Sequence, residues 1–371
     1  MMTNQARKPQ LADDWHSGEI DPDRPDVSIV LPAYNEAAIV EQNLARLCHY
    51  MESLERKYRW EIILINDGST DATGTLAEEF AHTHPNVRVY HHLTNFGIGE
   101  AFRYAFKLCR GTYIITLDTD LSYAPEHIEP MLAKLIDTRA NIVVASPYMT
   151  GGRISNVPRL RRVLSTWANR FLSIAAKGRL STLTSMARAY DARFLESLNL
   201  RSAGMDIMPE TVHKAMMLGA RVEEIPAHLD WGPQTGEDKP KRRSSMRLLR
   251  HTFATLLSGF IFRPVIFFLL PGMLLLLFSA WVGAWALIHF AGYYQELTTQ
   301  YPSMLLRASA ALEMAFDRHT HTFVIGLLAA MLATQLISLG ILALQSKSYF
   351  EELFHLGTTI FRAGNQHNGR D

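Results

Sequence analysis

The chain has 371 residues, which is enough for two domains and an ample buried core. Lysine and arginine number 37 and aspartate and glutamate 36, so the net charge of +1 gives no bulk electrostatic argument for binding nucleic acid. The two cysteines, Cys48 and Cys109, fall in predicted helices, where we expect buried thiols rather than a disulfide.

Short β-rich runs alternate with helical runs after a polar lead, residues 1–26, which we expect to be a disordered arm without a cleavable signal. Strands are predicted at residues 27–34, 60–69, 86–92, 111–118 and 141–146, and helices at 36–50, after Ser69 or Thr70, at 99–109 and at 125–137. Continuous apolar strands separated by helices are typical of an α/β fold with a mostly parallel sheet and helices on both faces.

Polar residues follow three of these strands at the edge where such sheets bind ligands. The segments are PAYNE (32–36), DGS (67–69) and DTD (118–120). The first strand is not followed by G-x-G-x-x-G and the chain has no Walker A sequence, which disfavours nicotinamide chemistry and a P-loop NTPase. An ionised carboxylate at the end of a buried strand is costly without a positive partner, so Asp118 and Asp120 are candidate ligands for a cation.

Four segments, in this order, carry a resemblance to a known family: VSIVLPAYNEA, IILINDGSTDAT, NFGIGEAFRYAFKLCRGTYIITLDTDLS and ASPYMTGG. They resemble family 2 glycosyltransferases. Within that family the chain is similar to polyprenyl-phosphate glycosyltransferases of the dolichyl-phosphate mannosyltransferase type, over roughly Val27 to Trp231. The resemblance implies the Rossmann-like GT-A fold and an inverting transfer of a sugar from a UDP- or GDP-sugar to a polyprenyl phosphate.

The D-x-D sequence is the candidate metal site. Mg²⁺ and Mn²⁺ favour oxygen ligands and commonly take one or two carboxylates plus substrate phosphates. We therefore expect Asp118 and Asp120 to hold one of these ions, which would neutralise the departing diphosphate. The alternative is a solvated turn, with Asp120 capping the next helix. The family often has Gln at the position of Ser122, so the third protein ligand stays open.

The donor contacts are implied by the resemblance alone. Those implied for the nucleotide sugar are Pro32, Ala33, Tyr34, Glu36, Asp67, Gly97 and Asp118. Asp67 is expected near the base or ribose. For Glu36, stabilisation of the helix dipole is the alternative, and for Gly97 it is a simple turn.

The acceptor side is predicted in the arginine-rich segment 151–170. Arg161 and Ser165 are four residues apart, so a helix places them on one face, where guanidinium and hydroxyl can clamp a phosphate. The resemblance assigns this pair to the lipid phosphate, with Arg162 as the adjacent candidate; the alternative is a solvated basic helix face. The family's S-R-Y appears here as Ser146-Pro147-Tyr148, so one arginine is missing, and Arg153 is a candidate to replace it.

Two more candidates follow. TSMARAY (184–190) resembles the family's T-S-G-F-R-A-Y, which implies that Arg188 contacts the acceptor phosphate. Glu210 either orients the acceptor or Arg188, or supports the fold. A lipid phosphate is already anionic and needs cations that hold it in line rather than a strong base. The predicted catalytic residues are Asp118, Asp120, Arg161, Ser165 and Glu210.

The C-terminal part is predicted to meet a membrane. Residues 239–263 carry seven Lys/Arg and no acid, with apolar residues spaced three and four apart, which indicates an interfacial amphipathic helix or one packed on the head. Two uncharged runs, 264–290 and 322–346, are each long enough to span a bilayer. Because basic residues concentrate before the first run, we expect the catalytic domain (27–238), both termini and the tail (347–371) in the cytoplasm and the loop 291–321 outside.

Two other functions remain open. A processive polysaccharide synthase would carry Q-x-x-R-W, whereas this chain has DWGPQ at 230–234, and two spans make a poor channel. A non-catalytic membrane scaffold with this fold is opposed by the D-x-D sequence and by Arg161 with Ser165. The expected partners are a nucleotide sugar, a polyprenyl phosphate that serves a cell-envelope glycan, and membrane lipids, but not nucleic acid; a homo-oligomer is left open.

Overall fold

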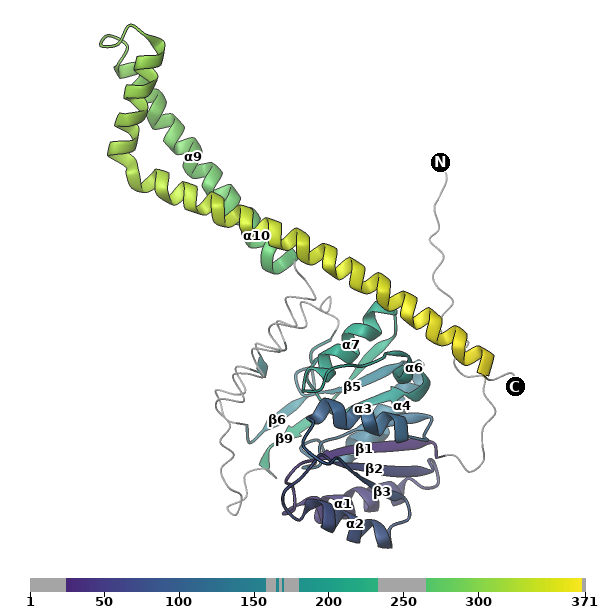
Figure 1. Cartoon of the computed structure of the whole chain (residues 1–371). Coiled ribbons are helices and arrows are strands. Elements are labelled where there is room, and N and C mark those ends of the chain that lie inside the picture. The colour runs from purple at the N-terminus through teal and green to yellow at the C-terminus, as the bar shows by residue number, and fades with distance from the viewer. Residues whose placement is uncertain (1–24, 158–164, 167–168, 170–179, 233–264, 369–371) are drawn as a thin grey trace. The chain divides into compact units, whose positions relative to one another are not determined.

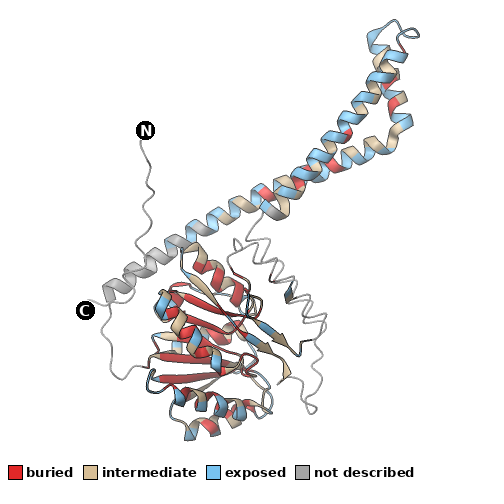
Figure 2. Cartoon of the chain, turned by 180° about the vertical axis from the view of Figure 1, so that it is seen from behind, coloured by how far each residue is buried: buried red, intermediate tan, exposed pale blue. Residues whose placement is uncertain are grey.

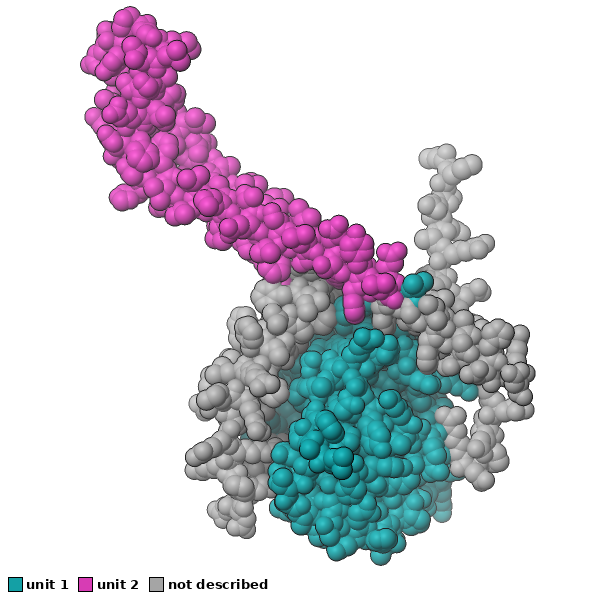
Figure 3. Space-filling model, in the orientation of Figure 1, with its two compact units in different colours: residues 1–259, 355–371 teal, residues 260–354 magenta. Residues whose placement is uncertain are grey.

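The computed structural model describes residues 25–157, 165–166, 169, 180–232 and 265–368 (Figure 1). The chain forms two compact units, residues 1–259 with 355–371 and residues 260–354 (Figure 3). The first contains the sheet and is called the head below; the second contains a helical hairpin. The expected interfacial helix at 239–263 lies outside the described residues.

The head is built on a seven-stranded sheet with the order β3-β2-β1-β4-β7-β5-β8. Its strands are β1 (Val27–Ala33), β2 (Trp60–Asn66), β3 (Val87–His91), β4 (Tyr113–Thr116), β5 (Ile142–Ser146), β7 (Arg188–Asp191) and β8 (Val222–Pro226). Strand β7 runs antiparallel to β4 and β5, and the other neighbours pair in parallel. The predicted mostly parallel sheet is confirmed. A second sheet pairs β6 (Arg153–Ser155) with β9 (His228–Asp230).

Helices cover both faces of this sheet (Figure 1). On one face lie α1 (Val40–Ser53), α2 (Thr73–Thr83) and α4 (Ile128–Thr138); on the other lie α3 (Ile98–Leu108), α6 (Ala192–Ser197) and α7 (Ile207–Met217). Strand β1 alternates between them, since Ile29 and Leu31 join the first cluster and Val30 joins the second. Burial on both faces, seen as red strands in Figure 2, explains why β1 and β2 are continuous apolar runs.

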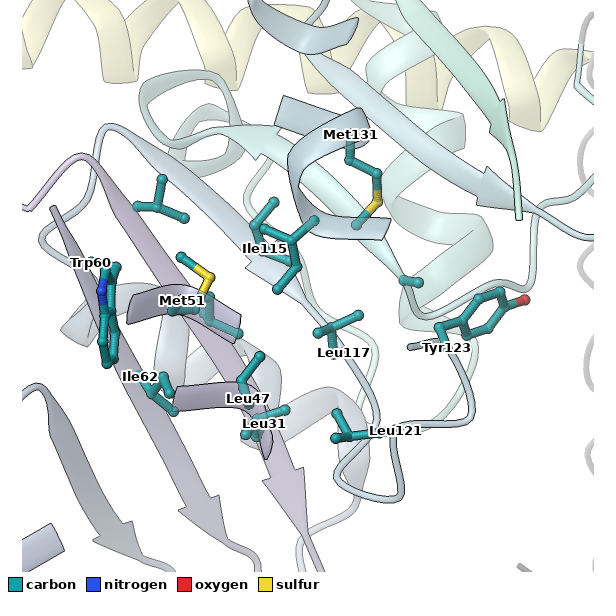
Figure 4. Packing of buried hydrophobic residues seen from close by; sticks show 14 of the residues in the cluster. Leu31, Leu47, Met51, Trp60, Ile62, Ile115, Leu117, Leu121, Tyr123 and Met131 are labelled. Carbon is teal, nitrogen blue, oxygen red and sulfur yellow. The ribbon is translucent and has the colours of Figure 1, made fainter. Parts of the chain in front are cut away.

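The core reaches the end of β4, where the D-x-D sequence begins. Figure 4 shows Leu117, Leu121 and Tyr123 in the same cluster as Leu31 and Met51. Leu121 is 3% exposed and Tyr123 5% exposed, although both belong to the loop that follows β4. The loop is therefore fixed by apolar packing on both sides of its carboxylates.

Both cysteines are free thiols, as expected. Cys48 is buried and Cys109 half-buried, and burial raises the pKa of each to about 12.

The second unit contains α9 (Leu270–Glu296), which follows a π-helical turn at Val265–Leu269, and most of α10 (Met304–Asn368). Both helices are long and apolar enough to cross a membrane, over Phe267–Glu296 and Met304–Phe350. Their side chains are largely exposed (Figure 2), which suits a lipid-facing surface.

Both helices extend past the two uncharged runs into the segment that separates these runs. Only residues 297–303 separate the two helices, so much of the segment predicted as a loop, 291–321, is helical. The charged residues of this segment are scattered among good helix formers, such as the Leu- and Ala-rich stretch 304–315. Isolated charged residues of this kind do not end a helix. The hairpin packs closely at Gly326, where a Cβ would lie 2.9 Å from Val282 Cγ1 and where the carbonyl accepts from Ser279 Oγ at 2.8 Å.

A buried carboxylate holds together the end of the head sheet at which β1 and β2 begin. Glu61, near the start of β2, is 2% exposed. Its Oε1 accepts from Ser28 Oγ at 2.6 Å and from the Arg110 N–H at 2.8 Å, and its Oε2 accepts from Arg88 Nη2 at 2.6 Å and Arg110 Nε at 3.0 Å. Burial alone would raise the pKa of Glu61, but the bonds from Ser28 and Arg110 and the charge of Arg88 outweigh it, so the pKa is lowered.

We predict that Glu61→Gln destabilises the head by about 3 kcal/mol at neutral pH, because it leaves two arginines without their buried anion. A lowered pKa contributes stability that is present above the ordinary value of 4.5 and is lost as pH falls through the folded value. The variant should therefore be nearest to wild type in acid. Urea unfolding of the full chain at several pH values measures this. Glu41→Gln, at an exposed carboxylate on α1, is the control. A pH-independent loss would contradict the explanation.

Candidate active site

The loop after β4 presents Asp118 and Asp120, both half-buried. The Ser122 N–H donates to Asp120 Oδ1 at 2.9 Å, and Ser122 Oγ lies 3.5 Å from Asp118 Oδ2. Leu121, between Asp120 and Ser122, has a φ of 49° and donates its N–H to the Asp118 carbonyl at 3.0 Å. Ser122 thus contacts both carboxylates, a positioning role that the sequence did not reveal.

The PAYNE loop lies next to this turn. Thr119 Oγ1 donates to the Pro32 carbonyl at 2.8 Å, which joins the two loops directly. Ala33 is buried, whereas the Tyr34 side chain is 39% exposed. Three residues predicted for the donor, Pro32, Tyr34 and Asp118, therefore lie at the same end of the sheet as Asp120, which is predicted for the metal.

The PAYNE loop is also bonded to the loop after β2. The Glu36 N–H donates to Thr73 Oγ1 at 2.8 Å, and the Asn35 N–H donates to Ser69 Oγ at 3.0 Å. In return the Thr70 N–H donates to Asn35 Oδ1 at 2.8 Å. Half-buried Glu36 is consequently held where its loop enters α1, near the start of α2.

Asp67 is the most buried acid at this edge, at 3% exposure. Its Oδ1 accepts from His92 Nδ1 at 2.7 Å and from the Phe96 N–H at 3.1 Å, and its Oδ2 accepts from the Gly97 N–H at 2.9 Å. Both oxygens are engaged by residues that follow β3. The direct contact with base or ribose that the resemblance implies is not favoured by this geometry, in which Asp67 holds the loop at residues 96–97.

Gly97 begins α3 in a conformation that favours glycine, with a φ of 96°. A Cβ there would lie 2.7 Å from the Ala203 carbonyl oxygen, which accepts from the Gly99 N–H at 2.8 Å. Residues 201–204 thus pack directly on the start of α3.

Glu210 holds this second segment. It accepts from the Arg201 N–H at 3.0 Å and the Ser202 N–H at 2.9 Å, and pairs with Lys214 Nζ at 2.6 Å. Burial would raise the pKa of Glu210, but the bonds from Lys214 and Ser202 outweigh it and lower the pKa. Of the two alternatives for Glu210, these contacts favour support of the fold.

Arg188 is fully buried, at 0% exposure. Its guanidinium donates to three carbonyl oxygens, those of Ser185 at 2.8 Å, Met208 at 2.7 Å and Leu183 at 2.6 Å. Among the described residues Arg188 therefore holds β7 to the 183–185 segment and to α7, and its contact with the acceptor phosphate stays a prediction.

Ser165 is held by two residues that the sequence did not single out. The Tyr148 hydroxyl lies 2.6 Å from Ser165 Oγ. Asn169, at 1% exposure, donates from Nδ2 to the Ser165 carbonyl at 3.0 Å, and its Oδ1 accepts from the Leu183 N–H at 3.1 Å. The sequence offered one clue to this contact, because Tyr148 follows Pro147, the proline at the position of the family's arginine.

The arginines of the acceptor prediction are only partly described. Arg153 stands exposed at the start of β6, where its N–H donates to the Ala227 carbonyl at 2.9 Å. Arg161 and Arg162 lie outside the described residues.

Comparison with known proteins identifies the family. The sequence profile described as "Glycosyl transferase family 2" matches residues 28–198. Polyprenol monophosphomannose synthase of Mycolicibacterium smegmatis is 31% identical over 205 residues, which cover 53% of this chain and 75% of that protein. The chain belongs to glycosyltransferase family 2. The predicted family is confirmed.

Other relatives of this family 2 glycosyltransferase match the same region. The dolichol-phosphate mannosyltransferase of Pyrococcus furiosus is 28% identical over 61% of this chain and 62% of its own length. The undecaprenyl-phosphate mannosyltransferase of Micrococcus luteus is 29% identical over 54% of this chain and 82% of its own length. A solved mannosyltransferase from Pyrobaculum calidifontis, in complex with GDP-Man and Mn²⁺, is 19% identical, with a TM-score of 0.42, and covers 91% of this chain and 92% of that one.

Gly68 allows the loops after β2 and β3 to touch. Its φ is 67°, and a Cβ would lie 2.2 Å from the Thr94 carbonyl carbon and 2.5 Å from the Asn95 nitrogen. Gly219 has nearly the same φ, 68°, but open space around the position of a Cβ.

We predict that Gly68→Ala destabilises the glycosyltransferase more than Gly219→Ala does. Both pay for a left-handed backbone, about 1 kcal/mol, but only Gly68→Ala also displaces backbone, at about 1–3 kcal/mol more. Urea unfolding of both variants measures the difference. Equal losses would show that the loop after β3 yields freely.

Proposed function

We propose that this family 2 glycosyltransferase transfers a sugar from a UDP- or GDP-sugar to a membrane polyprenyl phosphate, with inversion at the anomeric carbon. The observation that carries the proposal is the pair of half-buried carboxylates, Asp118 and Asp120. Thr119 between them is bonded to the PAYNE loop, whose Tyr34 is exposed, at the carboxyl edge of the sheet. The names of the relatives favour a polyprenyl phosphate as acceptor and mannose as the sugar.

The oxygen ligands at this site fit a divalent cation, Mg²⁺ or Mn²⁺. Asp118 and Asp120 offer hard carboxylate oxygens, and Ser122 steadies both. Within the described ranges, no group of three His, Cys, Asp or Glu side chains is arranged to hold a metal. The remaining ligands would therefore be diphosphate oxygens and water, which is common for Mg²⁺. When bound, the ion would supply Lewis-acid assistance to the departing diphosphate.

The chain's own residues bind and align the two substrates. On the donor side, the PAYNE loop offers the Tyr34 ring and the Glu36 carboxylate to the nucleotide sugar. On the acceptor side, we assign the lipid phosphate to Ser165 together with Arg161, Arg162 and Arg153. An oxygen of that phosphate attacks the anomeric carbon, the bond from this carbon to the diphosphate breaks, and the electron pair leaves with the nucleoside diphosphate. No proton has to be removed from the nucleophile, so positioning and charge carry the reaction.

We also propose how the chain is divided and placed. The catalytic domain, residues 27–238, and both termini lie in the cytoplasm, the basic segment 239–263 lies on anionic lipid, and the two helices of the hairpin cross the membrane. Support comes from the hairpin's exposed apolar surface and from the concentration of Lys/Arg before its first helix.

We predict that Asp120→Asn reduces transfer on the order of a hundredfold or more, because a metal ligand contributes at least as much as the residues that support it. Radiolabelled sugar transfer to polyprenyl phosphate, with and without EDTA, measures the activity. Calorimetry should show that Mn²⁺-dependent nucleotide binding is lost with the fold intact. Asp137→Asn removes the same charge from the exposed end of α4 and should be silent. Undiminished transfer by Asp120→Asn would overturn the metal assignment.

We predict that a cysteine at Ser303, between α9 and α10, is labelled from outside intact cells by a membrane-impermeant maleimide. A cysteine at Ser244, in the basic segment, should be labelled only after permeabilisation. Both substitutions are made in a background without Cys48 and Cys109. The reverse pattern would show that the head faces outward.

A further inference from the structure

Two consecutive histidines lie where β3 ends: His91 is its last residue and His92 follows it. His91 contacts Asn66, the last residue of β2, and His92 contacts Asp67, which follows it. His91 Nδ1 lies 3.0 Å from Asn66 Nδ2, and its Nε2 lies 2.8 Å from Glu78 Oε1. His92 Nδ1 lies 2.7 Å from Asp67 Oδ1, and the side chain of His92 is 10% exposed. The proposed reaction uses neither histidine.

The partners fix the proton on each ring. An amide NH₂ can only donate, so His91 accepts at Nδ1 and donates from Nε2 to Glu78. A carboxylate can only accept, so His92 donates from Nδ1 to Asp67. The neighbouring rings therefore use opposite nitrogens, and only His92 is bonded to Asp67.

Asp67 links this imidazole to the loop before α3. Its three donors among the described residues are His92, the Phe96 N–H and the Gly97 N–H. His92 is the one side chain of the three, while the other two are amides of the loop itself. Since an unpaired buried carboxylate is costly, the bond from the imidazole helps to offset the cost of burying Asp67, whose other two bonds hold the loop.

The His92 ring also packs against one aromatic residue of this loop and one of α3. Its centroid lies 5.3 Å from that of Phe96, nearly edge-on at 77°, and 5.3 Å from that of Tyr104 on α3. Phe96 is 54% exposed and Tyr104 37% exposed. His92 thus lies behind two aromatic rings that face solvent.

The same loop borders the segment bonded to PAYNE. Thr94 and Asn95 pass so close to Gly68 that no side chain fits there. The next residue, Ser69, accepts from the Asn35 N–H at 3.0 Å. A displacement of residues 94–97 would therefore reach the proposed donor side through Gly68 and Ser69.

We propose that His92 is a positioning residue for donor binding. Acting through Asp67, it holds residues 94–97 in place so that the Phe96 ring forms one wall of the nucleotide pocket. The proposal rests on the use of a nucleotide sugar, and it places His92 in the binding of the nucleoside diphosphate rather than in the transfer step.

Two substitutions distinguish the effect of losing the hydrogen bond to Asp67 from the effect of losing the aromatic ring. His92→Asn places an amide NH₂ near the position of Nδ1 and can still donate to Asp67, whereas His92→Gln places it near Nε2. Both lose the aromatic contacts. We expect His92→Gln to raise the KM for the donor about tenfold and His92→Asn about threefold or less, the difference being one charge-assisted bond. The kcat and the KM for polyprenyl phosphate should stay within about twofold of wild type, as expected when only binding common to the ground and transition states is lost.

The assay uses the full chain in detergent with Mn²⁺ and the member of a GDP-mannose, UDP-glucose and UDP-GlcNAc panel that the wild type binds most tightly. His91→Gln, at the ring bonded to Asn66, is the matched control and should leave the donor KM unchanged. Equal donor KM values for His92→Gln and His92→Asn would overturn the proposal, as would a loss confined to kcat.

Hydrogen exchange in the wild-type protein gives a second test that does not depend on a variant's folding. The amides of Phe96 and Gly97 should exchange slowly, and more slowly still with bound nucleotide sugar. Exchange at these amides that is indifferent to the nucleotide would overturn the proposal while leaving the glycosyltransferase assignment intact. If the wild type binds no member of the panel, the proposed function fails, and the positioning role fails with it.

Discussion

A carboxylate at the carboxyl end of a buried parallel strand has to find hydrogen-bond donors in the loops at that end of the sheet, because the strand and its covering helices supply none. This constraint shapes the functional edge of the head. Asp67 satisfies it completely, with three donors and 3% exposure. Asp118 and Asp120 are only half-buried, and each is in contact with Ser122. This difference in burial distinguishes Asp67, which orders the surrounding loops, from Asp118 and Asp120, which we propose to face a ligand.

The same chemistry serves stability at the other end of the sheet. Glu61 takes four hydrogen bonds from Ser28, Arg88 and Arg110 near the amino end of β2. Such a buried ion cluster is worth little against an apolar core of the same volume, but its loss leaves uncompensated charges. The head therefore holds its strands together at one edge and keeps the opposite edge for loops, glycines and half-buried acids.

Features that depend on neighbouring residues could be predicted from the sequence, whereas features that depend on contacts between distant parts of the chain could not. The strands β1 and β2 could be predicted because burial on both faces leaves a continuous apolar run. The D-x-D turn could be located because it follows such a run. Strand β7 could not, since four residues, RAYD, carry no periodicity and are a strand only through pairing with β4 and β5. The bond between Asp67 and His92 spans 25 residues and has no local signal. The burial of Arg188 could not be predicted either, because a charged residue is expected at the surface, whereas three carbonyl oxygens compensate this one inside.

The antiparallel strand β7 also has a consequence for synthesis on the ribosome. The order β3-β2-β1-β4 is complete once Thr116 has emerged, but β5, made next, pairs with β7 and β8, which are both made later. Until Asp191 leaves the exit tunnel, the nascent chain therefore exposes the free edge of β4, the strand that leads into the D-x-D turn. An open apolar edge of this kind invites pairing with other chains. The nascent head is thus most vulnerable to aggregation during the translation of residues 117–191, before either helix of the hairpin has been made.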